Sequence, residues 1–375
     1  MNRNLLFIAL ALLLWGFGEG MFINFIPIYL DTEFHLTKSQ IGLVLGIFGF
    51  SLMLTHLPAG WLADRLGRRP LLLAAWLIGL LATVLMALGR VLTLYLAGLF
   101  LYGLTSFVSS PLSSYVTAAR GKWSVGTALA LTTATFSTGM VFGPLMGGWI
   151  GEQWGMRVGF LTASAVFSVS TFFIFLIAAQ PLDHHDPAAP PPGLWKNRRF
   201  ALFLSIVAFA VFSMYLAVPL TPNFLESVRG LSLSQNGLVF AAGALGNALV
   251  AILLSRYEPR FGFLVAQGLV LLFALAIWQG NSLPVFALGY FLLGGFRAAR
   301  PMYLAQARAL VHDSQMGLTY GALETISGLV FFLTPPLAGL LFEWKPEAVY
   351  PLSIILLSFS IGIGWLFLPS REPHA

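Results

Sequence analysis

The sequence predicts an all-α protein that crosses a membrane twelve times. Of its 375 residues, 58% are hydrophobic and 9% are charged, and the mean hydropathy is +0.85. A soluble protein carries about 25% charged residues, so this chain lacks the polar side chains needed to face water on every side. Its apolar runs are continuous, whereas the strands of a membrane barrel would alternate apolar and polar residues.

Apolar runs long enough to cross the hydrocarbon core as a helix recur along the chain, and each crossing needs about 20 residues. The first run resembles a signal peptide, but it stays apolar to residue 30 without a small-residue cleavage site, so we expect it to be retained. The expected spans are residues 4–30, 39–62, 70–88, 91–117, 124–150, 156–179, 200–222, 234–255, 261–280, 283–306, 316–342 and 348–369.

The basic residues of the short loops are unevenly distributed between the two ends of these spans. With the N-terminus inside, most of the loop Lys and Arg side chains fall on the cytoplasmic side, as the positive-inside rule requires. We therefore expect a multi-pass protein of the inner membrane with both termini in the cytoplasm. The net charge of +6 then reflects topology, and no nucleic-acid partner is expected.

The longest polar stretch, residues 180–199, is rich in proline and charge and follows the sixth span. This composition is typical of a cytoplasmic linker, here between two halves, residues 1–179 and 200–375. The DHHD cluster at 183–186 has metal-binding residue types, but adjacent histidines in a flexible loop more often bind nothing. The chain has no cysteine, so thiolate metal sites and thiol catalysis are excluded, and we expect no metal and no cofactor.

The two halves repeat each other in sequence. Residues 125–152, in the fifth span, align with residues 316–343, in the eleventh, at a fixed offset. Gly126, Pro144, Gly148 and Glu152 then fall on Gly317, Pro335, Gly339 and Glu343. Parallel repeats of this kind, with a binding site between them, describe one major class of secondary transporter.

The loop after the second span reads GWLADRLGRRP over residues 60–70. Its glycines allow a tight turn between helix ends, and Asp64 is placed to accept from a helix N-terminus or to pair with an arginine. Contacts of that kind form in one conformation and break in another, so the loop is interpreted as a latch and not only as a basic anchor. The pattern closely resembles the signature loop of the major facilitator superfamily at Gly60, Asp64, Arg65, Gly67, Arg68 and Arg69.

A second stretch, GMVFGPLMGG at 139–148, resembles the glycine–proline motif of the exporter branches of that superfamily. Small residues let helices approach closely and proline bends a helix, so plain helix packing explains the motif as well as an antiport role does. The residues concerned are Gly139, Gly143, Pro144, Gly147 and Gly148. The resemblance to the twelve-helix drug/metabolite:proton antiporter branch implies two pseudo-symmetric six-helix bundles and a central cavity lined by spans one, four, seven and ten.

The sequence departs from that branch at two places. Its proton-coupled drug exporters often carry an arginine in span four, four residues before a glycine, and Leu99 stands at that position before Gly103. The second-half counterpart of the signature loop, SRYEPRFG at 255–262, keeps only basic residues and one glycine.

Ionisable side chains inside a membrane are costly and normally face a cavity or a partner. Glu19, in WGFGEGMFINF, lies in span one near mid-membrane and is flanked by glycines that allow a helix or a substrate to approach, or the helix to flex. It is our first candidate for the coupling proton or a cationic contact. The structural alternative is a hydrogen bond to a neighbour such as Asn24 or a backbone amide.

Span ten carries Arg297 and Arg300, which share one helix face because they lie three residues apart. Glu324, at a similar depth in span eleven, is expected to pair with one of them. The alternatives are a permanent structural ion pair, or a functional one in which the second arginine closes a cytoplasmic gate or binds substrate. The second arginine would remain free to hold an anionic substrate group. Tyr215 and Tyr320 offer further hydroxyls that are expected to line the cavity.

No phosphate-binding loop and no nucleophile or cofactor motif is present, so ATP-driven transport by this chain alone and enzymatic activity are both disfavoured. We expect a monomeric secondary active transporter in contact with lipid, a small-molecule substrate and protons, with the proton gradient as its energy source. The leading interpretation is proton-coupled export, by antiport, of an amphipathic or drug-like compound. The alternatives are proton-coupled symport or uptake of an organic anion or metabolite, and uniport.

Overall fold

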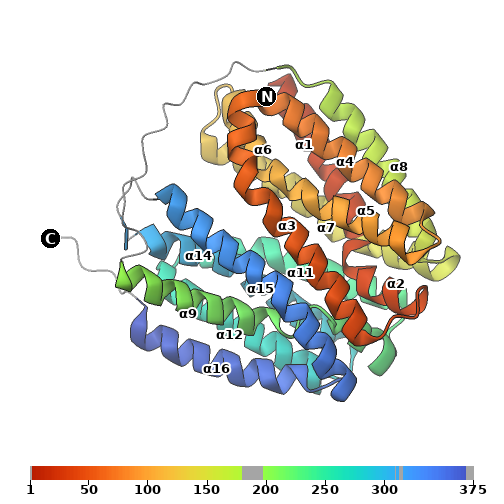
Figure 1. The fold of residues 1–375 in the computed structure, drawn as a ribbon, viewed down its shortest axis with the longest axis vertical. Coiled ribbons are helices and arrows are strands. Elements are labelled where there is room, and N and C mark those ends of the chain that lie inside the picture. The colour runs from red at the N-terminus through yellow and green to blue at the C-terminus, as the bar shows by residue number, and fades with distance from the viewer. Residues whose placement is uncertain (1, 180–196, 309, 312–315, 369–375) are drawn as a thin grey trace. The chain divides into compact units, whose positions relative to one another are not determined.

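A computed structural model of the chain describes residues 2–179, 197–308, 310–311 and 316–368. Within these ranges, the side chains of 56–66, 110 and 316–318 are not described. All regular secondary structure in the described residues is helical (Figure 1). The prediction of an all-α protein is therefore confirmed.

The described helices cover every expected span. In the first half they are α1 (Arg3–Gly20), α2 (Ile26–Thr32), α3 (Lys38–Leu66), α4 (Arg68–Leu88), α5 (Leu92–Leu104), α6 (Ser109–Ala119), α7 (Val125–Trp154) and α8 (Met156–Phe175). In the second half they are α9 (Arg198–Tyr215), α10 (Thr221–Asn223), α11 (Leu233–Leu254), α12 (Pro259–Gln279), α13 (Leu283–Leu292), α14 (Gly294–Arg308), α15 (Met316–Trp344) and α16 (Val349–Phe367).

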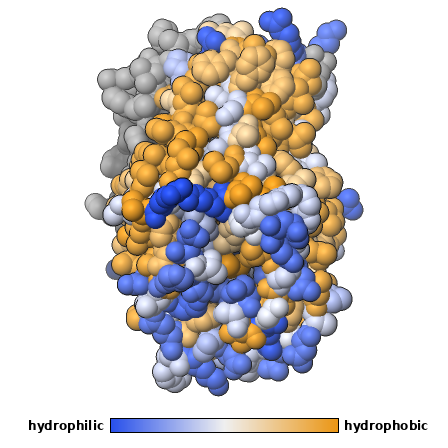
Figure 2. Space-filling view, turned by 90° about the vertical axis from the view of Figure 1, so that its right-hand side faces the viewer, coloured by the Kyte–Doolittle hydropathy of each residue, from blue (hydrophilic) through white to orange (hydrophobic). Residues whose placement is uncertain are grey.

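Ten spans among the described residues are long and apolar enough to cross a membrane, and α5 with α6 makes an eleventh, bent by 41°. The remaining expected span, 283–306, is covered by α13 and α14, where arginines lower the hydropathy. Large apolar side chains such as Leu81, Phe172 and Leu340 are more than half exposed. Figure 2 shows apolar residues over much of the upper part of one view and hydrophilic residues over its lower part.

Four spans are interrupted, and they are the first, fourth, seventh and tenth. Span one breaks between α1 and α2, span four between α5 and α6, span seven after α9, and span ten between α13 and α14. Proline or glycine lies at or just beyond each break, as with Pro219 in span seven and Gly294 in span ten, and both residues have a low helix propensity. In transporters, interrupted helices supply the substrate and ion sites.

The chain forms two compact units. Unit 1 comprises Met1–Leu36, Ile47–Pro187 and Gly230–Ala241, and unit 2 comprises Thr37–Gly46, Ala188–Arg229 and Ala242–Ala375. Each unit is therefore built around one sequence half but includes the beginning of a helix from the other, α11 in unit 1 and α3 in unit 2. In unit 1, α1 packs against α7 and α8, and in unit 2, α12 packs against α13, α14 and α16.

The glycine–proline motif of α7 sets the contact between α1 and α7. A Cβ atom added at Gly139, Gly143 or Gly147 would collide with backbone atoms of α1 or of Met21, the residue that follows it. From the other side, a Cβ at Gly20 would lie 2.9 Å from the Cδ of Pro144. The two backbones are therefore in direct contact, and this contact fixes the position of the last turn of α1.

The signature loop places Gly67 between α3 and α4 with φ of 83° and ψ of 162°. Two residues on, Arg69 Nη2 donates to the carbonyl oxygen of Phe175 at the end of α8, at 3.2 Å. In unit 2, Arg260 makes the corresponding bond to the carbonyl of Trp365, so this role persists where the loop sequence is degenerate. Arg68 is half-buried, and the side chains of Gly60, Asp64 and Arg65 lie outside the described residues.

Changing Gly67 to alanine is expected to lower the free energy of unfolding by about 1 to 3 kcal/mol, because residues other than glycine rarely adopt this backbone conformation. The matched control is Gly159→Ala in α8, where an added Cβ meets no atom within 4 Å. That change should be neutral or stabilising. Thermal unfolding in detergent measures both, and equal effects would contradict the assigned role of Gly67.

Candidate substrate and proton site

Glu19 lies in the last turn of α1, directly before the break in span one, and its side chain is half-buried. The indole Nε1 of Trp15, one helical turn earlier, donates to its Oε2 at 3.1 Å. A hydrogen bond to the carboxylate offsets part of the cost of placing a charge at this depth. The first partner of Glu19 is thus on its own helix.

Aromatic rings surround this carboxylate. Trp15 stacks on Phe167, with ring centroids 4.5 Å apart, and lies nearly parallel to Tyr102 at 6.1 Å. The rings of Phe22 and Tyr102 meet edge to face, with their centroids 5.2 Å apart. Tyr102 also interacts electrostatically with Glu19. We call Trp15, Glu19, Phe22, Tyr102 and Phe167 the Glu19 cluster, a carboxylate within an aromatic wall that draws on spans one, four and six.

The glycines beside Glu19 are used for helix packing. A Cβ at Gly16 would collide with the carbonyl of Phe136 on α7, and one at Gly18 would lie 2.8 Å from the ring of Phe167. Of the alternatives considered for these glycines, the structure thus shows the close approach of a neighbouring helix. Asn24 is half-buried in the short 3-10 turn that follows α1.

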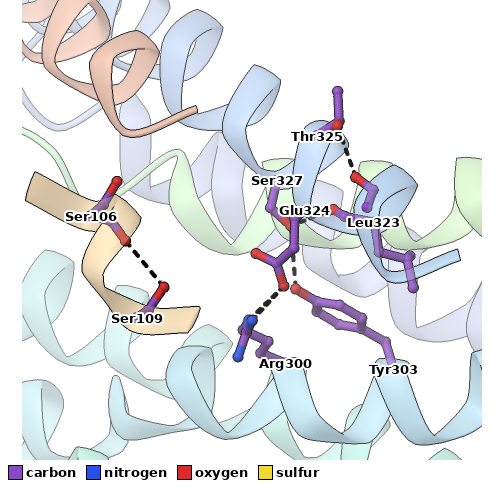
Figure 3. A network of polar contacts seen from close by, with 9 residues as sticks. Ser106, Ser109, Arg300, Tyr303, Leu323, Glu324, Thr325 and Ser327 are labelled. Carbon is purple, nitrogen blue, oxygen red and sulfur yellow. Dashed lines mark hydrogen bonds and ion pairs between the residues drawn. The ribbon is translucent and has the colours of Figure 1, made fainter. Parts of the chain in front are cut away.

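The charged residues that the sequence places inside the membrane in the second half, Arg297, Arg300 and Glu324, lie on α14 and α15. Arg300 Nε donates to Glu324 Oε1 at 2.8 Å and Nη2 lies 2.6 Å from the same oxygen, as Figure 3 shows. Of the two candidate arginines, the structure therefore pairs Arg300 with Glu324. The Arg300 side chain remains 58% exposed and Glu324 22% exposed, so the pair is only partly buried by the protein. Near it, the hydroxyls of Tyr303 and Ser327 lie 3.2 Å apart.

Arg297 is exposed, one turn before Arg300 on α14. Within the described residues, its guanidinium has no ion-pair partner, and Tyr215 is close enough to interact with it electrostatically. The Tyr215 ring stacks on that of Phe296, with centroids 5.6 Å apart, and its centroid lies 4.8 Å from that of Phe331. Tyr320 is 39% exposed on α15, one turn before Glu324 and on the same helix face.

Two residues of these clusters, Trp15 and Ser327, were not predicted although their spacing from the acids indicates them. Trp15 stands four residues before Glu19 and Ser327 three residues after Glu324, so each shares a helix face with the acid. Tyr102 and Phe167 come from other helices, and no local spacing indicates that they meet Trp15. The sequence thus identified the charged residues, and the fold supplied their aromatic surroundings.

Interrupted spans that carry charged side chains, as at Glu19, Arg297 and Arg300, are typical of secondary transporters. Residues 8–278 match the sequence profile of the Major Facilitator Superfamily. This match covers more than half of the chain, and the protein belongs to that family. It is a membrane transporter of small molecules and not an enzyme, and its fold is the twelve-helix fold of two pseudo-symmetric six-helix bundles.

Similar proteins include transporters with several kinds of substrate. The Multidrug resistance protein MdtG of Proteus mirabilis (strain HI4320) is 24% identical, and the alignment covers 97% of this chain and 96% of that protein. The Multidrug resistance protein 2 of Bacillus subtilis (strain 168) is 23% identical, over 92% and 90% of the two chains. The crystal structure of the nucleoside transporter NupG superposes with a TM-score of 0.78 at 14% identity, covering 98% of each chain, and this likeness concerns the fold.

Proposed function

We propose that this protein is a proton-coupled exporter, which moves amphipathic, drug-like compounds across the cytoplasmic membrane by antiport. The observation that carries the proposal is the Glu19 cluster, a half-buried carboxylate beside four aromatic side chains at the break of span one. The four rings are buried against one another in this structure. Once a movement of the bundles exposes them, their faces attract cations and bury apolar groups, and the carboxylate adds charge recognition. Its multidrug resistance relatives support the same substrate class.

In this proposal, one carboxylate serves both the proton and the substrate. Ionised Glu19 attracts a cationic compound, and protonation of Glu19 removes the attraction and releases it. Rocking of the bundles between inward-open and outward-open states exposes the carboxylate to each side in turn. Entry of a proton from outside thereby drives exit of the compound, with the proton gradient as the source of energy.

The remaining expectations belong to the same proposal. The signature loop, with Gly60, Asp64, Arg65, Gly67, Arg68 and Arg69, acts as a latch between conformations. The distribution of basic residues in the loops supports an orientation with both termini in the cytoplasm, and we propose that the protein works as a monomer in the inner membrane.

The proposal is tested with purified protein in liposomes under an imposed pH gradient. A fluorescent lipophilic cation should move against the proton flux, and a protonophore should abolish its accumulation. Accumulation that is insensitive to any ion gradient would show a uniporter and contradict the coupling. Movement of carboxylate probes together with protons, without movement of the cation, would instead support the alternative of organic-anion uptake.

That alternative rests on Arg297, whose guanidinium is exposed and has no ion-pair partner among the described residues. Arg300 is already neutralised by Glu324, so Arg297 is the side chain of this helix that is open to an anionic group. The stacked ring of Tyr215 gives it an aromatic neighbour. A substrate with a carboxylate and an apolar body fits this arrangement.

Replacing Glu324 with glutamine is expected to shift charge preference while leaving stability nearly unchanged. The pair is partly exposed, so its loss should cost less than about 1 kcal/mol of unfolding free energy. Freeing Arg300 should favour anionic over cationic probes by about threefold. Liposome flux with matched probes measures the ratio, and the swapped pair Arg300→Glu with Glu324→Arg should restore it. An unaltered ratio in Glu324→Gln would show that the pair is only structural.

A further inference from the structure

The end of α7 is tied to the beginning of α11 by a carboxylate. Glu152, in the last turn of α7, accepts at Oε2 from the hydroxyl of Ser232 and from the backbone N–H of Ser234, both at 2.8 Å. One turn before it, a Cβ at Gly148 would collide with the carbonyl of Leu233. We call Glu152, Ser232 and Ser234 clasp 1, and all three belong to unit 1.

The end of α15 is tied to the beginning of α3 in the same way. Glu343, in the last turn of α15, accepts from the backbone N–H of Ser39 at 2.9 Å and from its hydroxyl at 2.6 Å. One turn before it, a Cβ at Gly339 would lie 2.5 Å from the carbonyl of Lys38. Glu343 and Ser39 form clasp 2, which lies within unit 2.

The two clasps are copies of one another at the level of sequence. Glu152 and Glu343 occupy equivalent places in the repeat, and LTKSQIG at 36–42 matches LSLSQNG at 231–237. Thr37 with Gln40, and Ser232 with Gln235, form reciprocal capping boxes at the two helix starts. At each helix start, the capping box satisfies two backbone N–H groups. A glutamate from a helix of the other sequence half accepts from a further one.

Backbone contacts reinforce both clasps at equivalent positions. A Cβ at Gly237, one turn into α11, would collide with the carbonyl of Pro144, and one at Gly42 would collide with that of Pro335. Carboxylates are favoured at helix N-termini by the exposed N–H groups and by the helix dipole. Hydrogen bonds with a charged partner are also stronger than neutral ones. Each clasp therefore combines a charged cap with close backbone packing.

Chain connectivity places both clasps at one membrane face. Spans five and eleven end there, and spans two and eight begin there, since successive spans alternate in direction. Each clasp joins a helix of one sequence half to a helix of the other. In a transporter whose halves rock against each other, such a bond cannot persist through the whole cycle.

We propose that clasps 1 and 2 are a paired lock, which holds this face of the transporter closed and must release before substrate can pass there. In the proposed orientation this is the outer face. The lock rests on the two copies of the contact and on the transporter fold, and it holds whether the substrate is exported or taken up. This lock is distinct from the signature loop. The signature loop lies at the end of α3, whereas clasp 2 lies at the beginning of α3.

The experiment uses cysteine accessibility, because the natural chain has no cysteine and needs no background substitutions. Ala241 is 6% exposed and lies one turn beyond Gly237 on the same face of α11, so Ala241→Cys reports on opening. With Glu152→Ala and Glu343→Ala together, its labelling by a polar maleimide should rise about tenfold. Each single substitution should give about threefold, which keeps the test available if the double variant folds poorly.

Two controls separate release of the lock from general loosening. Ala266→Cys on α12 is fully buried, and its labelling should not change in the clasp variants. Glu347→Ala removes an acid that pairs with Lys345, just beyond α15, and should leave Ala241→Cys labelling as it was. Unchanged labelling at 241 in all clasp variants, or an equal rise at 266, would overturn the lock. Neither readout requires a known substrate, so failure here is distinguishable from failure of the proposed proton coupling.

Discussion

Replacing Glu19 with glutamine is expected to reduce proton-driven efflux of a cationic probe by about tenfold or more and to flatten its pH dependence. Glutamine keeps the shape and an oxygen for the Trp15 indole, so the local fold should persist, but it can neither ionise nor carry a proton. A charge pair about 4 Å apart is worth about 1 to 4 kcal/mol at effective dielectrics of 80 to 20. The lost attraction therefore corresponds to about fivefold in affinity at the lower value and to several hundredfold at the upper one.

Flux in liposomes, measured across a series of internal and external pH values, gives both the rate and its pH profile. Glu33→Gln is the matched control, because Glu33 is exposed at the end of α2 and lies outside the Glu19 cluster. It should behave as the unsubstituted protein does. If Glu19→Gln transported with unchanged rate, substrate range and pH dependence, the carboxylate would have only a structural role.

Among the substitutions proposed for this protein, Gly143→Leu is expected to lower the free energy of unfolding most. A Cβ at this position collides with the carbonyl of Phe17 and would lie 2.8 Å from the Cα of Gly20, so α1 and α7 must separate to admit any side chain. Overpacking a well-packed interior typically costs about 1 to 3 kcal/mol, and occasionally more. Because backbone atoms rather than flexible side chains obstruct the leucine, we expect at least about 3 kcal/mol.

Gly126→Leu is the control, since Gly126 is exposed near the beginning of the same helix and its nearest non-neighbouring atom is 4.0 Å away. Thermal unfolding in detergent and the yield of monodisperse protein compare the two variants. Gly143→Leu should unfold at a much lower temperature, and Gly126→Leu should be close to the unsubstituted protein. Equal stability of the two variants would contradict the close α1–α7 packing and its positioning of Glu19.

The fold was largely predictable because each span must hide its own backbone polar groups from lipid. That requirement places long apolar runs in the sequence, and all twelve became helices. The breaks in spans one, four, seven and ten were not predicted from local signals. Gly294 and Pro219 lie at two of them, but Pro144 and Pro335 stand inside continuous helices, so proline alone does not determine where a span breaks.

The candidate site was predictable only in part, because its charged residues are visible in the sequence but contacts between distant helices are not. Glu19, Arg297, Arg300 and Glu324 stand out because charge is rare in apolar runs. Similar depth on consecutive helices predicted that Glu324 pairs with Arg297 or Arg300, and the structure shows Arg300. The clasps were not foreseen, although the repeat had aligned Glu152 with Glu343. Glu343 meets Ser39 across 304 residues of chain, and no sequence spacing encodes such a meeting.

The most direct test of the account follows protons and substrate together in the absence of an imposed gradient. Liposomes containing the transporter and a pH-sensitive dye receive a lipophilic cationic probe from outside. Antiport through Glu19 predicts that entry of the probe drives protons out, so that the lumen becomes alkaline. The change should be absent with Glu19→Gln and present with Glu33→Gln. Probe entry at constant internal pH, or an acidifying lumen, would contradict proton antiport.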